Sequence, residues 1–263
     1  MTAPVFFVPV GSLAGLRPGD PVTLTGEEAR HAAQVQRVRP GERIDVADGA
    51  GQRGSGPVSL VDKATVVVTL DRLEAEPPAL PFITLVQALA KNRRDEAAIE
   101  AATELGVDAI VPWQADRSVV QWRGPEKADK GRARWQEVVK AAAKVARRAC
   151  LPEVMAPLTT SGLLQYLTEG HDIAVIVLHE AATEPFEAAL RDAAGHATIA
   201  LVVGPEGGIT DQELAAFRVQ GAGVVRLGPT VLRSSTAGPA ALAVLSQRLG
   251  RWDVPRGSDG AGG

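Results

Sequence analysis

The hydrophobic positions of this 263-residue chain follow two different rhythms, and the change comes near residue 75. Before it, short valine-rich runs are separated by turns: VFFV, PVTL, RIDVADG, PVSL and ATVVVTL. Turn signals at such short intervals predict a small β-barrel or compact sheet. One segment with helical periodicity, EEARHAAQVQRV (27–38), interrupts these strands.

After a proline-rich stretch, EAEPPALP (74–81), apolar runs alternate with helical patterns. The runs are FITLVQAL, VDAIVPW, DIAVIVL, TIALVV and GVVRLG; the helical patterns are RRDEAAIEAATEL, GRARWQEVVKAAAKVARRA, PFEAALRDAA, DQELAAFRVQ and AGPAALAVLSQRL. Near-continuous apolar strands between helices predict an α/β domain with a parallel sheet covered on both faces. We therefore expect a β domain over 1–72, a stiff linker over 73–81, an α/β domain over 82–250 and a flexible tail over 251–263.

Composition narrows the class of protein. Hydrophobic residues make up 45% of the chain, as in an ordinary globular protein. Cys150 is the one cysteine, so no internal disulfide is possible, and the four histidines lack the spacing of a zinc site. We find no secretory leader and no apolar run near the roughly 20 residues that span a bilayer. The sequence predicts a soluble cytoplasmic protein without a metal.

Charge is unevenly distributed along the chain. Residues 117–148 contain ten Lys/Arg and three Asp/Glu, a local charge of +7. Since the whole chain has a net charge of −3, the other 231 residues together carry −10. A basic block of this kind can neutralise several phosphates even on an acidic protein. A solvated helix face is the alternative interpretation.

The segment LVVGPEGGITDQELAAF (201–217) raises the first question of chemistry. Pro205 lacks an N–H donor, and Gly207 and Gly208 permit close approach of another group to the backbone. Thr210 and Glu213 form the T-x-x-E pattern of a capping box, which predicts a helix start. Ligands bind beyond the carboxyl ends of strands in such sheets. The phosphate-binding motifs are absent, and a carboxylate within the turn would repel a phosphate, so a ligand with an adenosine or a positive centre suits it better. A purely structural turn is the alternative.

A second glycine turn, LGPTVLRSSTAG (227–238), follows another short strand. Ser235 or Thr236 is the expected cap of the next helix. Val231 and Leu232 are apolar where a solvent loop would be polar, so we expect this loop to pack against a ligand or a neighbouring helix.

Together the two turns resemble those of the SPOUT methyltransferases, and most closely the ribosomal RNA small subunit methyltransferase E family. The resemblance also covers VFFV, His31, VQRVRPGERIDVADGAG, QALAK, ATELGVDAIVPW, DRSVVQW, ARW and the RR…LPEV stretch at 147–154. It implies an N-terminal PUA-like barrel, a C-terminal deep trefoil knot and methylation of N3 of one uridine in 16S rRNA, with S-adenosylmethionine as cofactor and a homodimer as the assembly.

The resemblance also implies roles for individual residues. Cofactor contacts would come from Leu178, His179, Glu180, Gly204, Pro205, Glu206, Gly207, Gly208, Ile209, Leu227, Gly228, Val231, Leu232, Ser235, Thr236 and Ala237. Arg233 is the catalytic candidate, because a guanidinium beside a uracil carbonyl would stabilise the anion formed at N3; a structural ion pair or phosphate contact is its alternative. RNA contacts are expected from His31, Arg37, Arg39, Lys91, Arg117, Arg123, Arg134 and Arg148.

The chain departs from the family pattern R-T-E-T-A, where it has Arg233-Ser234-Ser235-Thr236-Ala237, and at three positions elsewhere. Ser235 stands where the family commonly has Glu, Ala141 and Val145 replace Glu and Gln, and Val5 replaces Arg. These departures leave two alternatives open: a non-catalytic RNA-binding or ribosome-assembly protein, and a related methyltransferase with another RNA target. A dinucleotide-dependent dehydrogenase would need a fingerprint that the chain lacks.

Overall fold

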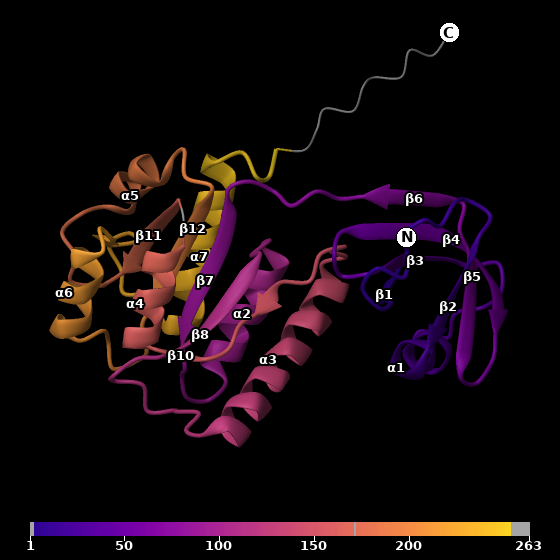
Figure 1. The fold of residues 1–263 in the computed structure, drawn as a ribbon, viewed down its shortest axis with the longest axis horizontal. Helices are drawn as coiled ribbons and strands as arrows, with labels where there is room; N and C mark the ends of the chain where they lie inside the picture. The colour runs from indigo at the N-terminus through magenta and orange to yellow at the C-terminus, as the bar shows by residue number, and fades with distance from the viewer. Residues whose placement is uncertain (1–2, 171, 254–263) are drawn as a thin grey trace, which may run out of the picture. The chain divides into compact units, whose positions relative to one another are not determined.

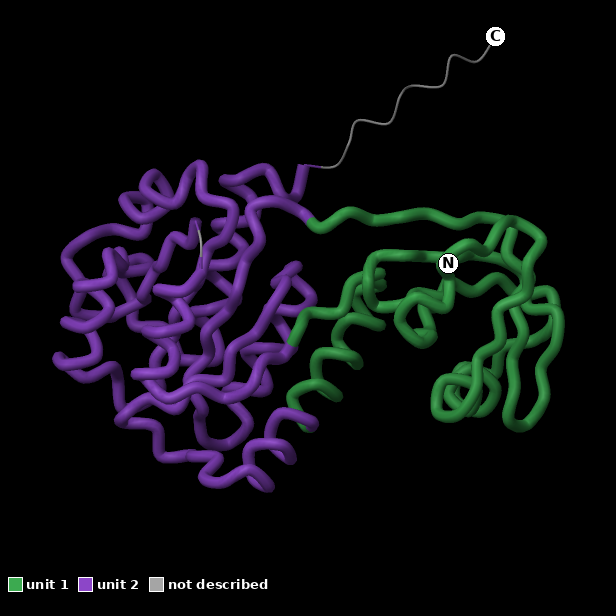
Figure 2. Tube along the Cα trace, in the orientation of Figure 1, with its two compact units in different colours: residues 1–78, 134–153 green, residues 79–133, 154–263 purple. Residues whose placement is uncertain are grey.

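The computed structural model describes residues 3–170 and 172–253, and the chain forms two compact units (Figure 2). Unit 1 comprises residues 1–78 and 134–153, and unit 2 comprises 79–133 and 154–263. The sequence-based division assigned 134–153 to the α/β domain, whereas in the structure this segment belongs to the unit that contains the N-terminal strands.

Unit 1 is built on a mixed six-stranded sheet. Its strands are β1 (Val5–Phe7), β2 (Pro21–Thr25), β3 (Arg43–Ala47), β4 (Gln52–Val61), β5 (Thr65–Thr69) and β6 (Arg72–Ala75). The order is β1-β3-β4-β5-β2, with β6 also on β4, and β1 and β3 are parallel. Alternate residues of β2 are buried, as a half-buried strand requires. Phe6, Leu24, Ile44 and Val68 lie at the centre of the core.

The predicted helix over 27–38 is present only in part. Helix α1 spans Gly26–Arg30 and continues as a π-helical turn, η1 (His31–Val35). Arg37 then takes a left-handed conformation with φ 54°. Such π-helical turns are rare and occur frequently at functional sites.

Unit 2 is built on a seven-stranded sheet covered by helices (Figure 1). Its strands are β7 (Phe82–Ala88), β8 (Ala109–Gln114), β9 (Glu153–Val154), β10 (Leu158–Thr159), β11 (Ile173–Leu178), β12 (Thr198–Val203) and β13 (Gly223–Val225). The order is β10-β8-β7-β12-β11-β13, and every pair along this path is parallel. The predicted parallel α/β sheet is thus confirmed, and the two-residue strands β9 and β10 were not predicted.

Helices lie on both faces of this sheet. They are α2 (Arg94–Glu104), α4 (Thr160–Glu169), α5 (Phe186–Ala193), α6 (Asp211–Val219) and α7 (Ser234–Arg248); the longest helix, α3 (Pro125–Val145), runs through the point where the units divide. Leu163 of α4 and Phe217 of α6 pack with Val86 and Val202 on one face. On the other face α7 packs against α2, and a Cβ added at Gly238 would lie 3.0 Å from a methyl of Leu85.

Two helix starts test the sequence analysis. The capping box at Thr210 is confirmed, since its hydroxyl accepts from the Glu213 N–H and the Glu213 carboxylate accepts from the Thr210 N–H. The expected cap of α7 at Ser235 or Thr236 is wrong, because the helix begins at Ser234 with Arg233 as the N-cap residue. Arg233 is extended, with ψ 154°, and α7 therefore starts earlier than its hydroxyl residues suggested.

Residues 251–253 fell within the predicted flexible tail, yet Arg251 is firmly bound. Its side chain is 4% exposed, and its guanidinium pairs with Asp108 at 2.8 Å and donates to the carbonyls of Gly106 and Ala79. The remainder of that tail, 254–263, lies outside the described residues. None of the described helices is long and apolar enough to cross a membrane.

Candidate active site

Four loops meet at the carboxyl ends of neighbouring strands in unit 2. The register pairs Val203 of β12 with Gln87 of β7 and with Leu178 of β11, and Leu178 also pairs with Val225 of β13. The loops that follow these strands therefore start side by side, at the end of a parallel sheet where ligands usually bind.

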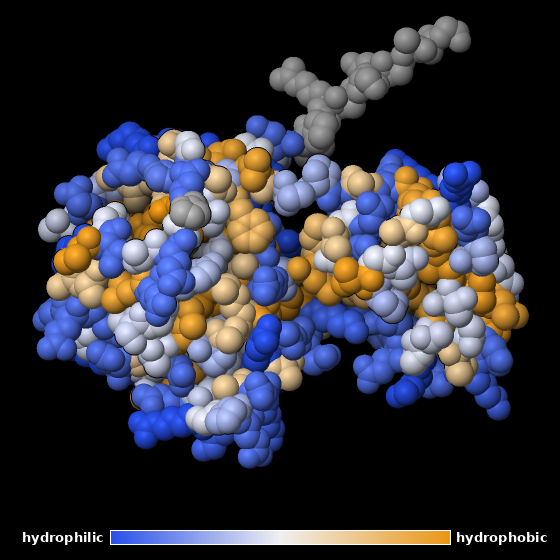
Figure 3. Space-filling model, viewed as in Figure 1, coloured by the Kyte–Doolittle hydropathy of each residue, from blue (hydrophilic) through white to orange (hydrophobic). Residues whose placement is uncertain are grey.

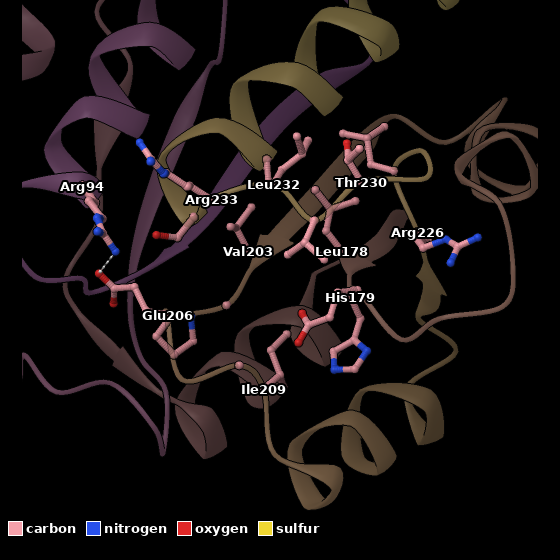
Figure 4. Close-up of a pocket in the computed structure, with 18 residues that line it drawn as sticks. Arg94, Leu178, His179, Val203, Glu206, Ile209, Arg226, Thr230, Leu232 and Arg233 are labelled. Carbon is pink, nitrogen blue, oxygen red and sulfur yellow. Dashed lines mark hydrogen bonds and ion pairs between the residues drawn. The ribbon is translucent and has the colours of Figure 1, made fainter.

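These loops enclose a pocket with a cavity volume of about 300 Å³ (Figure 4). Its lining comprises Arg94, Leu178, His179, Glu180, Val203, Gly204, Pro205, Glu206, Gly208, Ile209, Arg226, Leu227, Thr230, Val231, Leu232, Arg233, Ser234 and Ala237. Most of the predicted contacts are among them, and so is Arg233. Gly207, Gly228, Ser235 and Thr236 are not in the lining. Thr230 and Ser234 are, within the predicted loop 227–237, and Arg94, Val203 and Arg226 line the pocket without having been predicted.

The GPEGG turn needs its glycines for space and for conformation. Gly208 has φ +76°, which favours glycine. A Cβ at Gly204 would lie 2.6 Å from Cγ1 of Ile209, and one at Gly207 would lie 3.1 Å from the carbonyl oxygen and Cβ of Arg117. Larger residues would therefore displace the turn from the wall of the pocket.

A buried carboxylate fixes the chain just after this turn. Glu213, 2% exposed, accepts from the Thr210 N–H and hydroxyl at 2.9 Å each. Its other oxygen accepts from the Asp116 N–H at 2.9 Å and the Thr160 hydroxyl at 2.8 Å. The capping box is thus tied to the segment after β8 and to the start of α4.

The loop from Leu227 to Arg233 offers unused backbone donors. No N–H of this loop donates to an acceptor within residues 3–170 and 172–253. The Ser234 side chain at the start of α7 is buried, and its Oγ likewise has no partner among the described atoms. Leu178, Val203 and Ile209 supply apolar walls nearby. The pocket thus combines an apolar slot with free donors, which suits an organic ligand with polar edges.

Charged side chains lie on two sides of the pocket: Figure 4 draws Arg94, Glu206 and Arg233 together on one side and Arg226 on the other. Glu206 Oε1 accepts from Arg94 Nη1 at 3.3 Å and from the Lys91 N–H at 3.2 Å. Arg233 is exposed, and its guanidinium has no hydrogen bond or ion pair within the described part of the chain. His179 Nδ1 is 3.3 Å from the Ala181 N–H, at the far end from Glu206.

The predicted RNA-contacting residues divide between the units. Lys91, Arg117 and Arg123 belong to unit 2, and His31, Arg37, Arg39, Arg134 and Arg148 belong to unit 1. In unit 2, Arg117 donates to the Gly207 carbonyl at 3.2 Å, so two of the three lie beside the GPEGG turn. Figure 3 shows a hydrophilic surface where α3 begins, just after Arg123.

Unit 1 carries a second, larger concavity of about 1260 Å³. His31 lies in its lining, edge to face with the Phe6 ring at 6.0 Å, and the family-departing Ala141 and Val145 line it as well. Glu28 is buried in its wall, 3.1 Å from Lys140 and 2.7 Å from Lys144. Burial by itself raises the pKa of Glu28, but hydrogen bonds and charge from the two lysines outweigh it and leave the pKa below its ordinary value.

Across residues 3–170 and 172–253 no three His, Cys, Asp or Glu residues are grouped to hold an ion.

Comparison with known proteins matches both parts of the chain. The RNA methyltransferase domain family covers residues 77–246, and the RNA methyltransferase PUA domain covers 24–71. Ribosomal RNA small subunit methyltransferase E of Mycobacterium bovis is 45% identical over 90% of each chain. The protein of that name from Bacillus subtilis is 31% identical over 85% of this chain and 89% of its own length.

Solved structures agree in fold along nearly the whole length. The crystal structure of a ribosomal RNA small subunit methyltransferase E from Neisseria gonorrhoeae, bound to S-adenosylmethionine, has a TM-score of 0.82 at 28% identity and covers 94% of this chain and 98% of its own. A methyltransferase from Legionella pneumophila, also in complex with that cofactor, has a TM-score of 0.81 at 28% identity, with coverages of 94% and 98%. This chain, with its PUA domain followed by an α/β domain whose loops enclose one pocket, belongs to the ribosomal RNA small subunit methyltransferase E family.

Proposed function

We propose that this protein transfers a methyl group from S-adenosylmethionine to N3 of a specific uridine in 16S ribosomal RNA of the small subunit. Family membership supports methylation of ribosomal RNA with this cofactor. The structural observation that supports the proposal most directly is the pocket at the carboxyl ends of four parallel strands, which has an apolar slot and unpaired backbone donors. The uridine and its N3 atom are the finer part of the proposal. Because ribosomal RNA is the proposed substrate, we place the reaction in the cytoplasm.

The residues present fit S-adenosylmethionine. Leu178, Val203 and Leu232 offer apolar surface for an adenine ring, and the backbone donors of 227–233 suit its polar edge. The buried Ser234 hydroxyl lacks a partner, and such a group gains from a ligand acceptor. When bound, the cofactor supplies a methyl group already activated by its sulfonium.

The protein then has to orient a uracil and stabilise the charge that develops on it. N3 lies on the Watson–Crick face, so the target nucleotide must be unpaired or flipped out of its helix. Loss of the N3 proton leaves negative charge shared with the two carbonyl oxygens. Arg233, unpaired within the described part of the chain and in the pocket lining, is the proposed donor to one of these oxygens.

The finer features of the fold belong to the same proposal. We infer that the sheet of unit 1 closes as a PUA-like barrel and that the chain around α7 forms a deep trefoil knot. Close packing of α7 on β7 at Gly238 is in line with a helix held tightly against the sheet.

We further propose a homodimer in which the partner covers the pocket loop. Val231 of the pocket loop is 76% exposed and Val244 of α7 is 39% exposed, so both offer apolar surface to a partner. Between them, Ala240 and Ala243 give α7 a small, half-exposed surface that would accept a second copy closely.

Titration calorimetry of S-adenosylmethionine tests the cofactor site first. Wild type should bind with micromolar Kd. Gly207→Val should lose at least 100-fold, because its side chain must displace Arg117 or the turn. Gly162→Val is the matched control, since a Cβ there meets only ordinary contacts at 3.6 Å in α4, and it should bind as wild type does.

Methyl transfer to small-subunit RNA or particles, with mapping of the product base, tests the reaction. A product at uridine N3 supports the proposal; methylation of another base or another RNA overturns the target. A folded protein that binds RNA but not millimolar cofactor would instead be a non-catalytic RNA-binding module.

A further inference from the structure

A strained turn connects β7 to α2 and reaches the pocket. Asn92 and Arg93 are consecutive non-glycine residues in the left-handed region, with φ 55° and 59°. Such conformations persist only where surrounding contacts impose them, and they cluster at binding and catalytic sites.

Two carboxylates accept hydrogen bonds from the backbone of this turn. Asp95, 5% exposed, accepts from the Ala90 N–H at 3.1 Å. Glu206 of the GPEGG turn accepts from the next N–H along the chain, that of Lys91, at 3.2 Å. The segment is therefore fixed to the base of α2 by one acid and to the pocket by the other.

The result of this arrangement is the placement of Arg94. Its side chain is 42% exposed and lines the pocket, with one 3.3 Å hydrogen bond to Glu206. A guanidinium has five N–H donors, so most of those on Arg94 remain available. Figure 4 draws Arg94 and Arg233 on the same side of the pocket, with Glu206 below them.

The charges explain how an acidic turn can receive RNA. Glu206 alone would repel a phosphate, but its Oε1 is engaged by Arg94 and the Lys91 N–H. Two guanidinium groups and one carboxylate leave a net positive charge on this side of the pocket, and planar guanidinium groups match phosphate oxygens well.

We propose that Arg94 is a substrate-binding residue whose guanidinium holds a backbone phosphate of the nucleotide that enters the pocket, while Glu206 and the Lys91–Arg93 turn fix its position. The inference rests on the proposed function, because it takes the entering ligand to be an RNA nucleotide. It assigns to Arg94 a part in RNA recognition that is separate from cofactor binding.

The test compares Arg94→Gln, Arg94→Lys and a matched control with wild type. Arg218→Gln is the control, since Arg218 is an exposed arginine near the end of α6 and outside the pocket lining. Arg94→Gln should bind S-adenosylmethionine within twofold of wild type and raise the KM for RNA at least tenfold.

The salt dependence of RNA affinity separates a phosphate contact from a structural role. Loss of one contact to single-stranded RNA should reduce the slope of log Kobs against log salt concentration by about 0.7. Arg94→Lys should keep the wild-type slope, because it keeps the charge, and the control should match wild type throughout.

Three results would overturn the inference. If Arg94→Gln weakens cofactor binding and leaves the salt dependence of RNA affinity unchanged, Arg94 only stabilises the GPEGG turn through Glu206. If the wild-type protein methylates no small-subunit RNA, the proposed function fails and the inference fails with it. If the wild type methylates normally and Arg94→Gln has an unchanged KM for RNA and an unchanged salt slope, the inference alone is refuted.

Discussion

Glu213 should be among the most sensitive single positions in unit 2, because one carboxylate joins three segments. It accepts four hydrogen bonds: two from Thr210, one from the Asp116 N–H and one from the Thr160 hydroxyl. Glu213→Ala leaves these donors without their acceptor and removes half of the capping box.

The magnitude follows from the contacts. Three of the four donors, the Asp116 N–H and the hydroxyls of Thr160 and Thr210, lose their acceptor in a partly buried site at a cost of about 1 kcal/mol each, at the lower end of the range for unsatisfied groups; the fourth, the Thr210 N–H, belongs to the cap. Loss of the cap adds about 1 kcal/mol. Glu213→Ala should therefore lower the free energy of unfolding by about 4 kcal/mol, which for a domain of this size is a fall in Tm of about 10 °C. Glu213→Gln keeps the shape and one accepting oxygen, so about 2 kcal/mol is expected.

Urea unfolding with matched Tm measurements reads the loss, and hydrogen exchange shows where it arises. The Asp116 and Thr210 amides should exchange faster in Glu213→Ala than in wild type. Glu104→Ala changes an exposed residue at the end of α2 and serves as the control. Its free energy of unfolding should stay within about 0.5 kcal/mol of wild type, as is usual for surface substitutions. A Glu213→Ala protein less than about 1 kcal/mol below wild type, with Asp116 still protected, would refute the reasoning.

Two further predictions concern buried charge. Arg251→Ala should lower the free energy of unfolding by about 3–5 kcal/mol in urea, because it removes the guanidinium that neutralises the largely buried Asp108 carboxylate; a loss under about 1 kcal/mol would contradict the role given to that ion pair. Burial raises the pKa of Glu28, but Lys144 and Lys140 lower it further, so its folded-state pKa lies below the ordinary value of 4.5. The pairing of Glu28 with these lysines therefore stabilises the folded state fully at pH above 4.5, and this stability is lost as the pH falls through the lower folded-state pKa. Glu28→Gln should thus have a lower Tm than wild type at pH 7, with the gap closing in acid; a gap that is constant with pH would contradict it.

Local pattern predicted much of unit 2. The apolar runs around β7, β8, β11 and β12 identified the parallel strands, since such runs are what a doubly covered sheet requires. The Thr210 and Glu213 pattern identified the start of α6, because a capping box is a contact between residues three apart. Local contacts of this kind are encoded in adjacent residues.

Long-range contacts were not predictable in this way. Asp116 and Thr160 lie 97 and 53 residues from Glu213, and nothing in their own segments indicates that they share its carboxylate. The start of α7 was misplaced for a related reason: Ser235 and Thr236 are good capping residues, but the helix extends back to Ser234, whose hydroxyl is buried beside the pocket.

One omission had a usable signal. Arg94 follows β7, and the carboxyl end of β7 lies beside that of β12. The rule that led from GPEGG and LGPTVLRSSTAG to a site at this end of the sheet applies equally to the loop after β7. The predicted site was located by its glycine-rich turns. The turn after β7 contains no glycine and reaches its left-handed conformations with Asn92 and Arg93 instead.

The strand order also explains why the departure at Ser235 does not argue against activity. With β7, β12, β11 and β13 adjacent, the pocket is formed by loop backbone, by apolar side chains and by polar side chains that include Arg94, Glu206, Arg233 and Ser234. Ser235 does not line it, so the pocket walls of this chain do not depend on the side chain at that position. Loss of function through this loop would require a change at a lining residue or in the glycine turns, and both remain suited to a bound cofactor.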